Sequence, residues 1–219
     1  MKKFKLRASS GGKLSGKRGL GQTGFGYCEA WVKEQLYSRR NSAPKTKQII
    51  KGLKNEDESI DFIAKFHNYG FLTKNEEFFE DDYFQGTPDI VLKDEIIDVK
   101  NSWSPFTFPL FETSVPNDDY FYQGQIYMEL TGRKKFKLIY TLTNAPFDLI
   151  ESEARRYCYA EGVDFDDEIL QKFTDEMTFD KVPDNLKIKT FEFEHDPSVI
   201  DFLKERIIEA RLYIDTLKY

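Results

Sequence analysis

The chain has 219 residues, of which 40% are hydrophobic and 16% aromatic, so it is long and apolar enough to form a domain with its own core. No apolar run approaches the ~20 residues that span a bilayer, and the first residues lack an apolar signal segment, which argues against a membrane or secreted protein. The two cysteines, Cys28 and Cys158, show neither a disulfide framework nor metal-site spacing, as expected in a reducing cytoplasm.

The formal net charge of −6 is unevenly distributed along the chain. Residues 1–54 contain fourteen Lys and Arg and two Asp and Glu, a local charge of +12, so the remaining residues carry −18. This asymmetry predicts a basic surface at one end, suited to a phosphate backbone, and an acidic surface elsewhere. A solvated basic arm without a partner is the alternative interpretation.

The N-terminal part combines a short polar segment with two expected helices. Residues 7–10 read Arg-Ala-Ser-Ser and precede two glycines. The Arg and Ser side chains can donate hydrogen bonds to phosphate oxygens, and the glycines allow the backbone to approach a phosphate closely. An ordinary loop with a capping serine is the alternative. Helical spacing of apolar residues predicts helices over about 27–39 and 46–69, the second with Gly52 in its interior. On spacing alone, Glu56 of that helix is a surface residue.

Two β-branched runs, 90–92 and 96–99, flank a polar tripeptide and predict a β-hairpin. Because side chains alternate along a strand, Asp98 and Lys100 share one face, and the hairpin folds Asp89 back towards it. Such buried charges are costly unless they are paired or bound to metal. Two carboxylates suit Mg²⁺ or Mn²⁺, and the ammonium can orient or deprotonate an attacking water. A surface hairpin with a solvated Asp/Lys pair is the alternative.

After the hairpin, an aromatic, proline-broken loop over 101–111 is expected to contact a nucleic-acid end, or alternatively to plug the core or form an oligomer contact. A helix over 118–131 places Tyr120, Gln123 and Tyr127 on one stripe.

The C-terminal part predicts two more strands and a final helix around an acidic insertion. The expected ranges are a strand at 136–142, a partly helical acidic insertion at about 144–187, a strand at 188–193 and a helix over 198–217. No linker or repeat divides the chain, so residues 1–219 are expected to form a single domain.

Four segments carry a resemblance to a known family. Pro88-Asp89 followed by Asp98-Val99-Lys100 resembles the PD-(D/E)xK nuclease signature in its DxK form. Three other segments match, in order, motifs of the lambda-type (YqaJ-like) phage recombination exonucleases of that superfamily: Arg7-Ala8-Ser9-Ser10, Gly52-x-x-x-Glu56 and Tyr120-x-x-Gln123. The resemblance covers roughly residues 5–143, and it departs from the pattern in having Asp98 where many relatives have Glu.

The resemblance implies a fold, a cofactor and a set of site residues. The fold would be α/β, with a central mixed β-sheet flanked by helices in a restriction-endonuclease-like core. Mg²⁺, with Mn²⁺ as a substitute and two ions in all, would be held by Asp89, Asp98, the Val99 carbonyl and Glu56. Lys100 and Gln123 complete the implied catalytic set. The residues implied to bind DNA and its 5′-phosphate are Arg7, Ser9, Ser10, Thr87 and Tyr120.

The implied function is Mg²⁺-dependent, 5′-to-3′ exonuclease digestion of duplex DNA in phage-type recombination or DNA processing. The implied setting is the cytoplasm of a bacterium or a phage-infected host, with duplex ends as substrate and a single-strand annealing protein as partner. The family's ring-shaped trimer is also implied, although the acidic insertion has no counterpart among the matched motifs. Two alternatives stay open: an endonuclease of restriction or junction-resolving type, and a non-catalytic DNA-binding protein.

Overall fold

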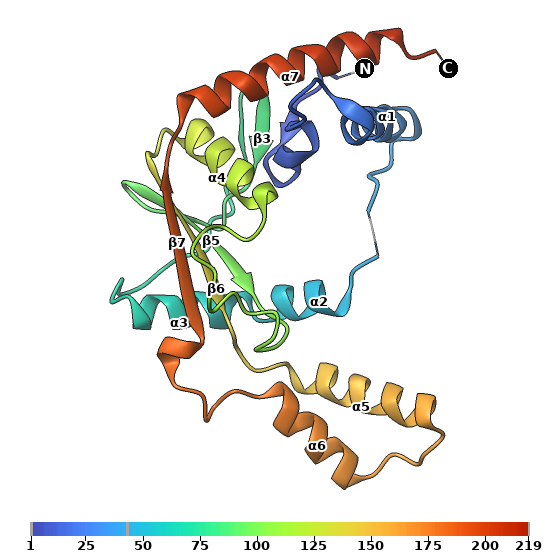
Figure 1. Ribbon diagram of the computed structural model, residues 1–219, viewed down its shortest axis with the longest axis vertical. Coiled ribbons are helices and arrows are strands. Elements are labelled where there is room, and N and C mark those ends of the chain that lie inside the picture. Colours follow the sequence, from blue (N-terminus) through green and yellow to red (C-terminus); the bar gives the residue numbers. More distant parts are fainter. Residues whose placement is uncertain (1, 43, 219) are drawn as a thin grey trace.

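The computed structural model describes residues 2–42 and 44–218, and its centre is a sheet of the order β4-β5-β6-β7 (Figure 1). β4 pairs antiparallel with β5, β5 parallel with β6, and β6 antiparallel with β7, so the sheet is mixed, as the sequence predicted. A parallel pair requires a crossover, and helix α4 (Asp118–Thr131) supplies it between β5 and β6. The four strands are β4 (Ile90–Val91), β5 (Glu95–Asn101), β6 (Lys135–Thr141) and β7 (Ile188–Glu194).

Helices cover both faces of this sheet, and each face has an apolar cluster. On one face, α3 (Glu56–Phe66) packs Ile60 and Ile63 against Ile97 of β5. On the other face, α4 and the C-terminal helix α7 (Pro197–Thr216) pack with the N-terminal segments over Ile96. The contact with α4 requires a glycine, because a Cβ on Gly124 would lie 2.6 Å from the Phe193 ring.

A second, small sheet of the order β1-β3-β2 joins the N-terminus to the segment before the hairpin. Its strands are β1 (Leu6–Arg7), β2 (Phe79–Glu80) and β3 (Phe84–Gly86), which the sequence analysis did not predict. β1 runs parallel to β3, with Leu6 opposite Phe84 and Arg7 opposite Gln85. Because β1 pairs with β3, the 3₁₀ helix η1 (Ala8–Leu14), which follows β1, lies near the segment that leads into the hairpin.

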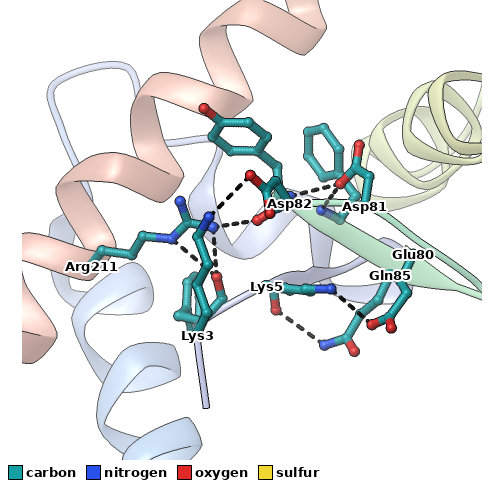
Figure 2. A network of polar contacts seen from close by, with 10 residues as sticks. Lys3, Lys5, Glu80, Asp81, Asp82, Gln85 and Arg211 are labelled. Atoms are coloured by element: carbon teal, nitrogen blue, oxygen red, sulfur yellow. Dashed lines mark hydrogen bonds and ion pairs between the residues drawn. The ribbon is translucent and has the colours of Figure 1, made fainter. Parts of the chain in front are cut away.

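Polar contacts fix the small sheet in place, as Figure 2 shows. The Lys5 ammonium pairs with Glu80 at 2.9 Å, and the Gln85 side chain donates to the Lys5 carbonyl at 3.2 Å. Arg211 of α7 donates to the Phe4 carbonyl at 2.9 Å and to the Asp82 carbonyl at 2.5 Å. The N-terminal strand is therefore held from both the sheet and the C-terminal helix.

Two of the expected helices differ from the sequence prediction. α1 (Gly21–Tyr37) begins earlier than the expected position near residue 27. The single helix expected over 46–69 is two helices, α2 (Lys47–Lys54) and α3, with the break at Asn55. The Asn55 side chain donates to the Thr143 hydroxyl at 2.7 Å and to the Asn144 carbonyl. The break between the two helices thus coincides with a tertiary polar contact, and Gly52 lies within α2.

The acidic insertion forms a pair of helices at the end of the molecule opposite both termini (Figure 1). It comprises α5 (Phe147–Glu161), α6 (Asp167–Met177) and the 3₁₀ turn η2 (Asp184–Leu186), and α5 and α6 share a small apolar cluster with Trp103. Of the helices in the described ranges, none has both the length and the apolar character needed to cross a membrane.

Candidate active site

Strand β5 presents the Asp-Val-Lys segment as the alternation predicted. Asp98 is buried, with 1% of its surface exposed, and its Oδ2 pairs with the Lys100 ammonium on the same face of the strand. That ammonium also lies 4.9 Å from the centre of the Tyr120 ring on α4. Val99 points to the opposite face, where it packs with the cluster under α3.

Asp89 immediately precedes β4 and reaches across to β5. Its Oδ2 accepts a hydrogen bond from the Val99 N–H at 2.8 Å. The pairing of β4 with β5 ends at Ile90 opposite Ile97, so the edge of β5 beyond this point is open to the Asp89 side chain. The N–H and C=O of a strand residue point to the same side, so the Val99 carbonyl lies on this edge too. The predicted convergence of the two aspartates and the lysine is confirmed.

The two carboxylates repel one another at this edge. Burial, followed by the charge of Asp98, raises the pKa of Asp89 to about 7, although Lys100 and the Val99 N–H act in the opposite direction. Burial acts to lower the pKa of Lys100, but Asp98 and Asp89 outweigh it and raise that pKa. The site is therefore one in which the lysine keeps its proton and Asp89 ionises with difficulty.

Glu56 lies at the start of α3 and lines the same cavity as Asp89. Its carboxylate pairs with the Lys74 ammonium at 2.6 Å, so it is neither a free surface residue nor a partner of the aspartates. The cavity has a volume of about 480 Å³ and lies between α2, the end of β5 and the loop that follows β5. Its lining includes Ile49, Leu53, Trp103, Thr107, Tyr120 and Tyr140.

A chain of hydrogen bonds from α4 holds the Asp98 side chain in place. The Gln123 amide donates to Asp98 Oδ1 at 3.2 Å and to the Tyr127 hydroxyl at 3.1 Å. The Tyr127 hydroxyl donates to the Thr87 carbonyl at 3.0 Å, two residues before Asp89. Gln123 and Tyr127 of the predicted stripe thus connect Asp98 to the segment that precedes Asp89. No role was predicted for Tyr127, although its i, i+4 spacing from Gln123 was a usable signal.

Tyr127→Phe removes only the hydroxyl that connects Gln123 to the Thr87 carbonyl. We expect a loss of about 1 kcal/mol in the free energy of unfolding and a fall of about 10–100-fold in the rate of any reaction at this site. Thermal denaturation and a DNA cleavage assay would measure the two effects. Tyr122→Phe on the same helix is the control, because that hydroxyl has no hydrogen bond within the described residues. Equal activity of the two variants would contradict a positioning role for Tyr127.

Lys51 of α2 fastens the loop after β5 and was missed by the sequence analysis. It is fully buried, and its ammonium donates to the carbonyls of Ser102 at 2.7 Å and Trp103 at 3.4 Å. Burial lowers its pKa to about 8, and Glu58 offsets this only in part. No sequence signal identified it, because a lysine on a helix is normally exposed and its partners lie about fifty residues away.

Lys51→Met is expected to lower the free energy of unfolding by about 1–3 kcal/mol, because the buried Ser102 carbonyl and the partly buried Trp103 carbonyl lose their donor. Between pH 8 and 10.5 the unfolded wild-type chain still binds the Lys51 proton that the folded chain has released, so wild-type stability rises with pH. The variant should lack this contribution. Thermal denaturation at pH 8 and pH 10 tests it, with the half-exposed Lys54→Met as the control. A pH dependence in Lys51→Met equal to that of the wild type would refute the assignment.

The residues expected to bind a 5′-phosphate are only partly brought together. Arg7, Ser9 and Thr87 line a second cavity of about 1130 Å³, whereas Ser10 does not line it and Tyr120 lines the first cavity instead. The Arg7 guanidinium pairs with Glu34 at 2.5 Å, and Glu34 is itself buried. Burial acts to raise the pKa of Glu34, but the Arg7 guanidinium lowers it. Arg7 is thus positioned by a carboxylate, which leaves part of its donor capacity for a ligand.

The donors at the first cavity fit a divalent cation in kind. Asp98 Oδ2 has the Lys100 ammonium as its partner, and a cation between the aspartates would relieve the repulsion that raises the pKa of Asp89. The site has too few side-chain ligands as it stands. Among the described residues, no three Asp, Glu, His or Cys side chains lie close enough together to hold an ion. Glu56 would have to exchange its Lys74 partner to join them.

No protein-family model and no curated protein matches the chain. Solved structures do match it. A phage-related exonuclease from Haemophilus somnus 129PT superposes with a TM-score of 0.77 and 24% sequence identity, over 98% of this chain and 95% of that one. The alkaline exonuclease LHK-Exo from Laribacter hongkongensis gives a TM-score of 0.64 and 14% identity, over 96% and 88%. The chain has the fold of these exonucleases.

The match extends to parts of the chain that the motifs did not reach. Because it covers 98% of the chain, it includes the acidic insertion at 144–187, for which the sequence motifs offered no counterpart. The structure of LHK-Exo in complex with dAMP superposes equally well, with a TM-score of 0.65 and 15% identity, over 96% of this chain and 88% of that one. The expected α/β fold, with a mixed sheet flanked by helices, is confirmed.

Proposed function

We propose that the protein is a metal-dependent DNA exonuclease that hydrolyses duplex DNA from a 5′ end. The observation that carries the proposal is the convergence of Asp89, Asp98 and Lys100 at an open strand edge, in a chain with an exonuclease fold. LHK-Exo, which shares the fold, was solved in complex with dAMP, and this supports a nucleotide as the ligand.

In this proposal Asp89, Asp98 and the Val99 carbonyl would hold Mg²⁺ or Mn²⁺, and Glu56, which is paired with Lys74, would be the candidate ligand for a second ion. When bound, the ion supplies Lewis acidity towards the scissile phosphate and lowers the pKa of a water. Gln123 and Tyr127 keep Asp98 and the Thr87 segment in register.

Lys100 is best suited to donate a hydrogen bond that orients the attacking water. Its pKa is raised by the two aspartates, so without a cation it holds its proton at neutral pH and is a poor base. Tyr120, against the ammonium, limits where that donor can point. Arg7, Ser9 and Thr87 line the second cavity and would receive a terminal phosphate there, which supports the proposal of 5′ polarity.

Three substrates incubated with Mg²⁺ test the proposal: linear duplex with a 5′-phosphate, linear duplex with a 5′-hydroxyl, and a covalently closed circle. Loss of the linear DNA only, faster with the phosphate, is the expected result. Cutting of the circle would make the protein an endonuclease. No cutting with either Mg²⁺ or Mn²⁺ would leave a non-catalytic DNA-binding protein. Asp98→Asn is the control for contaminating nucleases.

Assembly, partner and setting are separate proposals. A ring-shaped trimer, a single-strand annealing partner, a role in phage-type recombination and a cytoplasmic location rest on the family resemblance alone. Light scattering of the purified protein tests the trimer directly.

A further inference from the structure

The second cavity is much larger than a terminal phosphate needs. Its volume of about 1130 Å³ exceeds the ~300–1,000 Å³ typical of pockets that bind drug-sized ligands. It lies between the N-terminal strand β1, the end of α1 and the segment that leads into Asp89. Its charged lining comprises six Lys and Arg and two Glu, a net charge of +4, from Lys2, Lys3, Lys5, Arg7, Arg39 and Arg40 with Glu34 and Glu80.

Only some of the cationic side chains that line this cavity form ion pairs within the fold. Lys3, Lys5 and Arg7 pair with Asp82, Glu80 and Glu34. Lys2, Arg39 and Arg40 are exposed and make no ion pair with any residue that the structure describes. None of these three cations has a carboxylate at ion-pair distance among the described residues, although Arg40 acts on Glu34 from a longer distance and helps to lower its pKa. A polyanion is the ligand that this charge favours.

An exposed aromatic ring accompanies these cations. Phe78 lines the cavity with 55% of its surface exposed, at the start of the small sheet. Cations that follow a phosphate backbone, together with an exposed ring on which a base can stack, are the features of single-strand binding sites. Duplex DNA offers its bases only at an end, so the ring favours a single strand.

The cavity opens next to the proposed catalytic residues. Gly86, Thr87 and Tyr127 are among its lining residues and form one wall together, because a Cβ on Gly86 would lie 2.7 Å from the Tyr127 ring. Through Gln123, Tyr127 is hydrogen-bonded to Asp98. A strand whose phosphate is cut at Asp98 would thus pass this wall and enter the cavity.

We propose that this cavity binds a single-stranded 5′ tail of several nucleotides that extends beyond the scissile phosphate. The inference rests on the proposed function. A 5′-overhanging end would enter with its tail on Lys2, Arg39, Arg40 and Phe78. Water would then attack the phosphorus, the bond to the 3′ oxygen of the tail would break, and that oxygen would take up a proton. The products are a short oligonucleotide with a 3′-hydroxyl and a shortened duplex with a 5′-phosphate.

Linear duplexes with blunt ends, with 5′ tails of two, four and six nucleotides, and with matching 3′ tails test this inference. Product lengths from 3′-labelled and 5′-labelled strands would be resolved on denaturing gels. The expected result is release of oligonucleotides whose length follows the 5′ tail. Release of mononucleotides only, from every 5′ tail, would overturn the inference, as would the same length dependence for 3′ tails.

Two variants connect the result to the cavity. Arg39→Gln with Arg40→Gln, and Phe78→Ala, should each lower kcat/KM on 5′-tailed ends relative to blunt ends, by about fivefold or more where one stacked base is lost. The matched control is Arg155→Gln with Arg156→Gln, an adjacent pair of exposed arginines on α5 in the acidic insertion. This control should leave the ratio unchanged. Equal ratios in all variants would overturn the inference.

A binding measurement separates this inference from the proposed function. The anisotropy of a labelled single-stranded oligonucleotide with a 5′-phosphate, measured in EDTA, reports the cavity without cleavage. If the wild type cuts no DNA but binds the oligonucleotide through Arg39 and Arg40, the proposed function fails and the cavity assignment stands. If the wild type cuts duplex ends but binds the oligonucleotide as weakly as the Arg39/Arg40 variant does, the proposed function stands and the cavity assignment fails.

Discussion

Asp89→Asn is expected to abolish DNA cleavage while making the metal-free protein more stable at neutral pH. The asparagine oxygen can still accept the hydrogen bond from the Val99 N–H, so the local geometry survives. The negative charge that would bind the cation is lost. Replacing a residue that only supports a metal ligand typically lowers metal affinity or activity by about 10–100-fold. Replacing a ligand itself should therefore lower the cleavage rate by more than about 100-fold. The measurement is the rate of duplex digestion at saturating Mg²⁺.

The gain in stability follows from the raised pKa of Asp89. Because this pKa is about 7 in the folded protein and 3.8 in the unfolded chain, the folded state holds a proton that the unfolded state has released between these values. Wild-type stability therefore falls as the pH rises through this window, and Asp89→Asn should lack that contribution.

Thermal denaturation in EDTA at pH 5 and pH 8 tests this. The advantage in Tm of Asp89→Asn over the wild type should be larger at pH 8. Mg²⁺ should stabilise the wild type and have little effect on the variant. An Asp89→Asn protein that responds to Mg²⁺ as the wild type does would remove Asp89 from the metal site.

Lys100→Met is expected to be inactive and also less stable. Loss of a group that orients or transfers a proton costs about 10²–10⁴-fold in rate. Removal of the ammonium leaves Asp98, which is 1% exposed, as an unpaired buried carboxylate, and breaking such a pair costs about 3–5 kcal/mol in the free energy of unfolding. Urea denaturation and duplex digestion measure the two effects.

Two further proteins separate the roles of the pair. Lys137→Met is the matched control, because Lys137 lies on the neighbouring strand β6, pairs with Glu95 at 2.9 Å and has a similarly exposed side chain. Its register opposite Ile97 places it on the other face of the sheet, so cleavage should be retained. Asp98→Asn combined with Lys100→Met should recover most of the lost stability and none of the activity. Cleavage at the wild-type rate by Lys100→Met would refute the proposed mechanism.

Elements with strong local signals were predicted closely. The helix over 118–131 is observed with those bounds, because the Asn117 side chain caps its start and Gly132, with a φ of 73°, ends it. The hairpin strands, expected over 90–92 and 96–99, are observed as Ile90–Val91 and Glu95–Asn101, and the alternation in β5 puts Asp98 and Lys100 on one face as predicted. The strands β1, β2 and β3 span only two or three residues each, too few for a periodic pattern.

In the candidate site, too, some features follow from local sequence patterns and others do not. Its three central residues follow from a local pattern, and their contacts are as the pattern required. Three ion-pair and hydrogen-bond partners did not follow from any pattern: Glu34 for Arg7, Lys74 for Glu56 and the Ser102 carbonyl for Lys51. These partners lie between about twenty and fifty residues apart along the chain, so no helical or strand period relates them.

The sequence by itself determined which side chains share a face of β5 and where the basic residues are concentrated, because both depend only on neighbouring positions. Only the tertiary structure decided which charges are paired and which stay free. Coulomb energies and burial depend on distances in space, and β1 beside β3 and α2 beneath the loop after β5 set those distances. For this reason Glu56 is engaged by Lys74, while Lys2, Arg39 and Arg40 face a cavity with no ion-pair partner among the described residues.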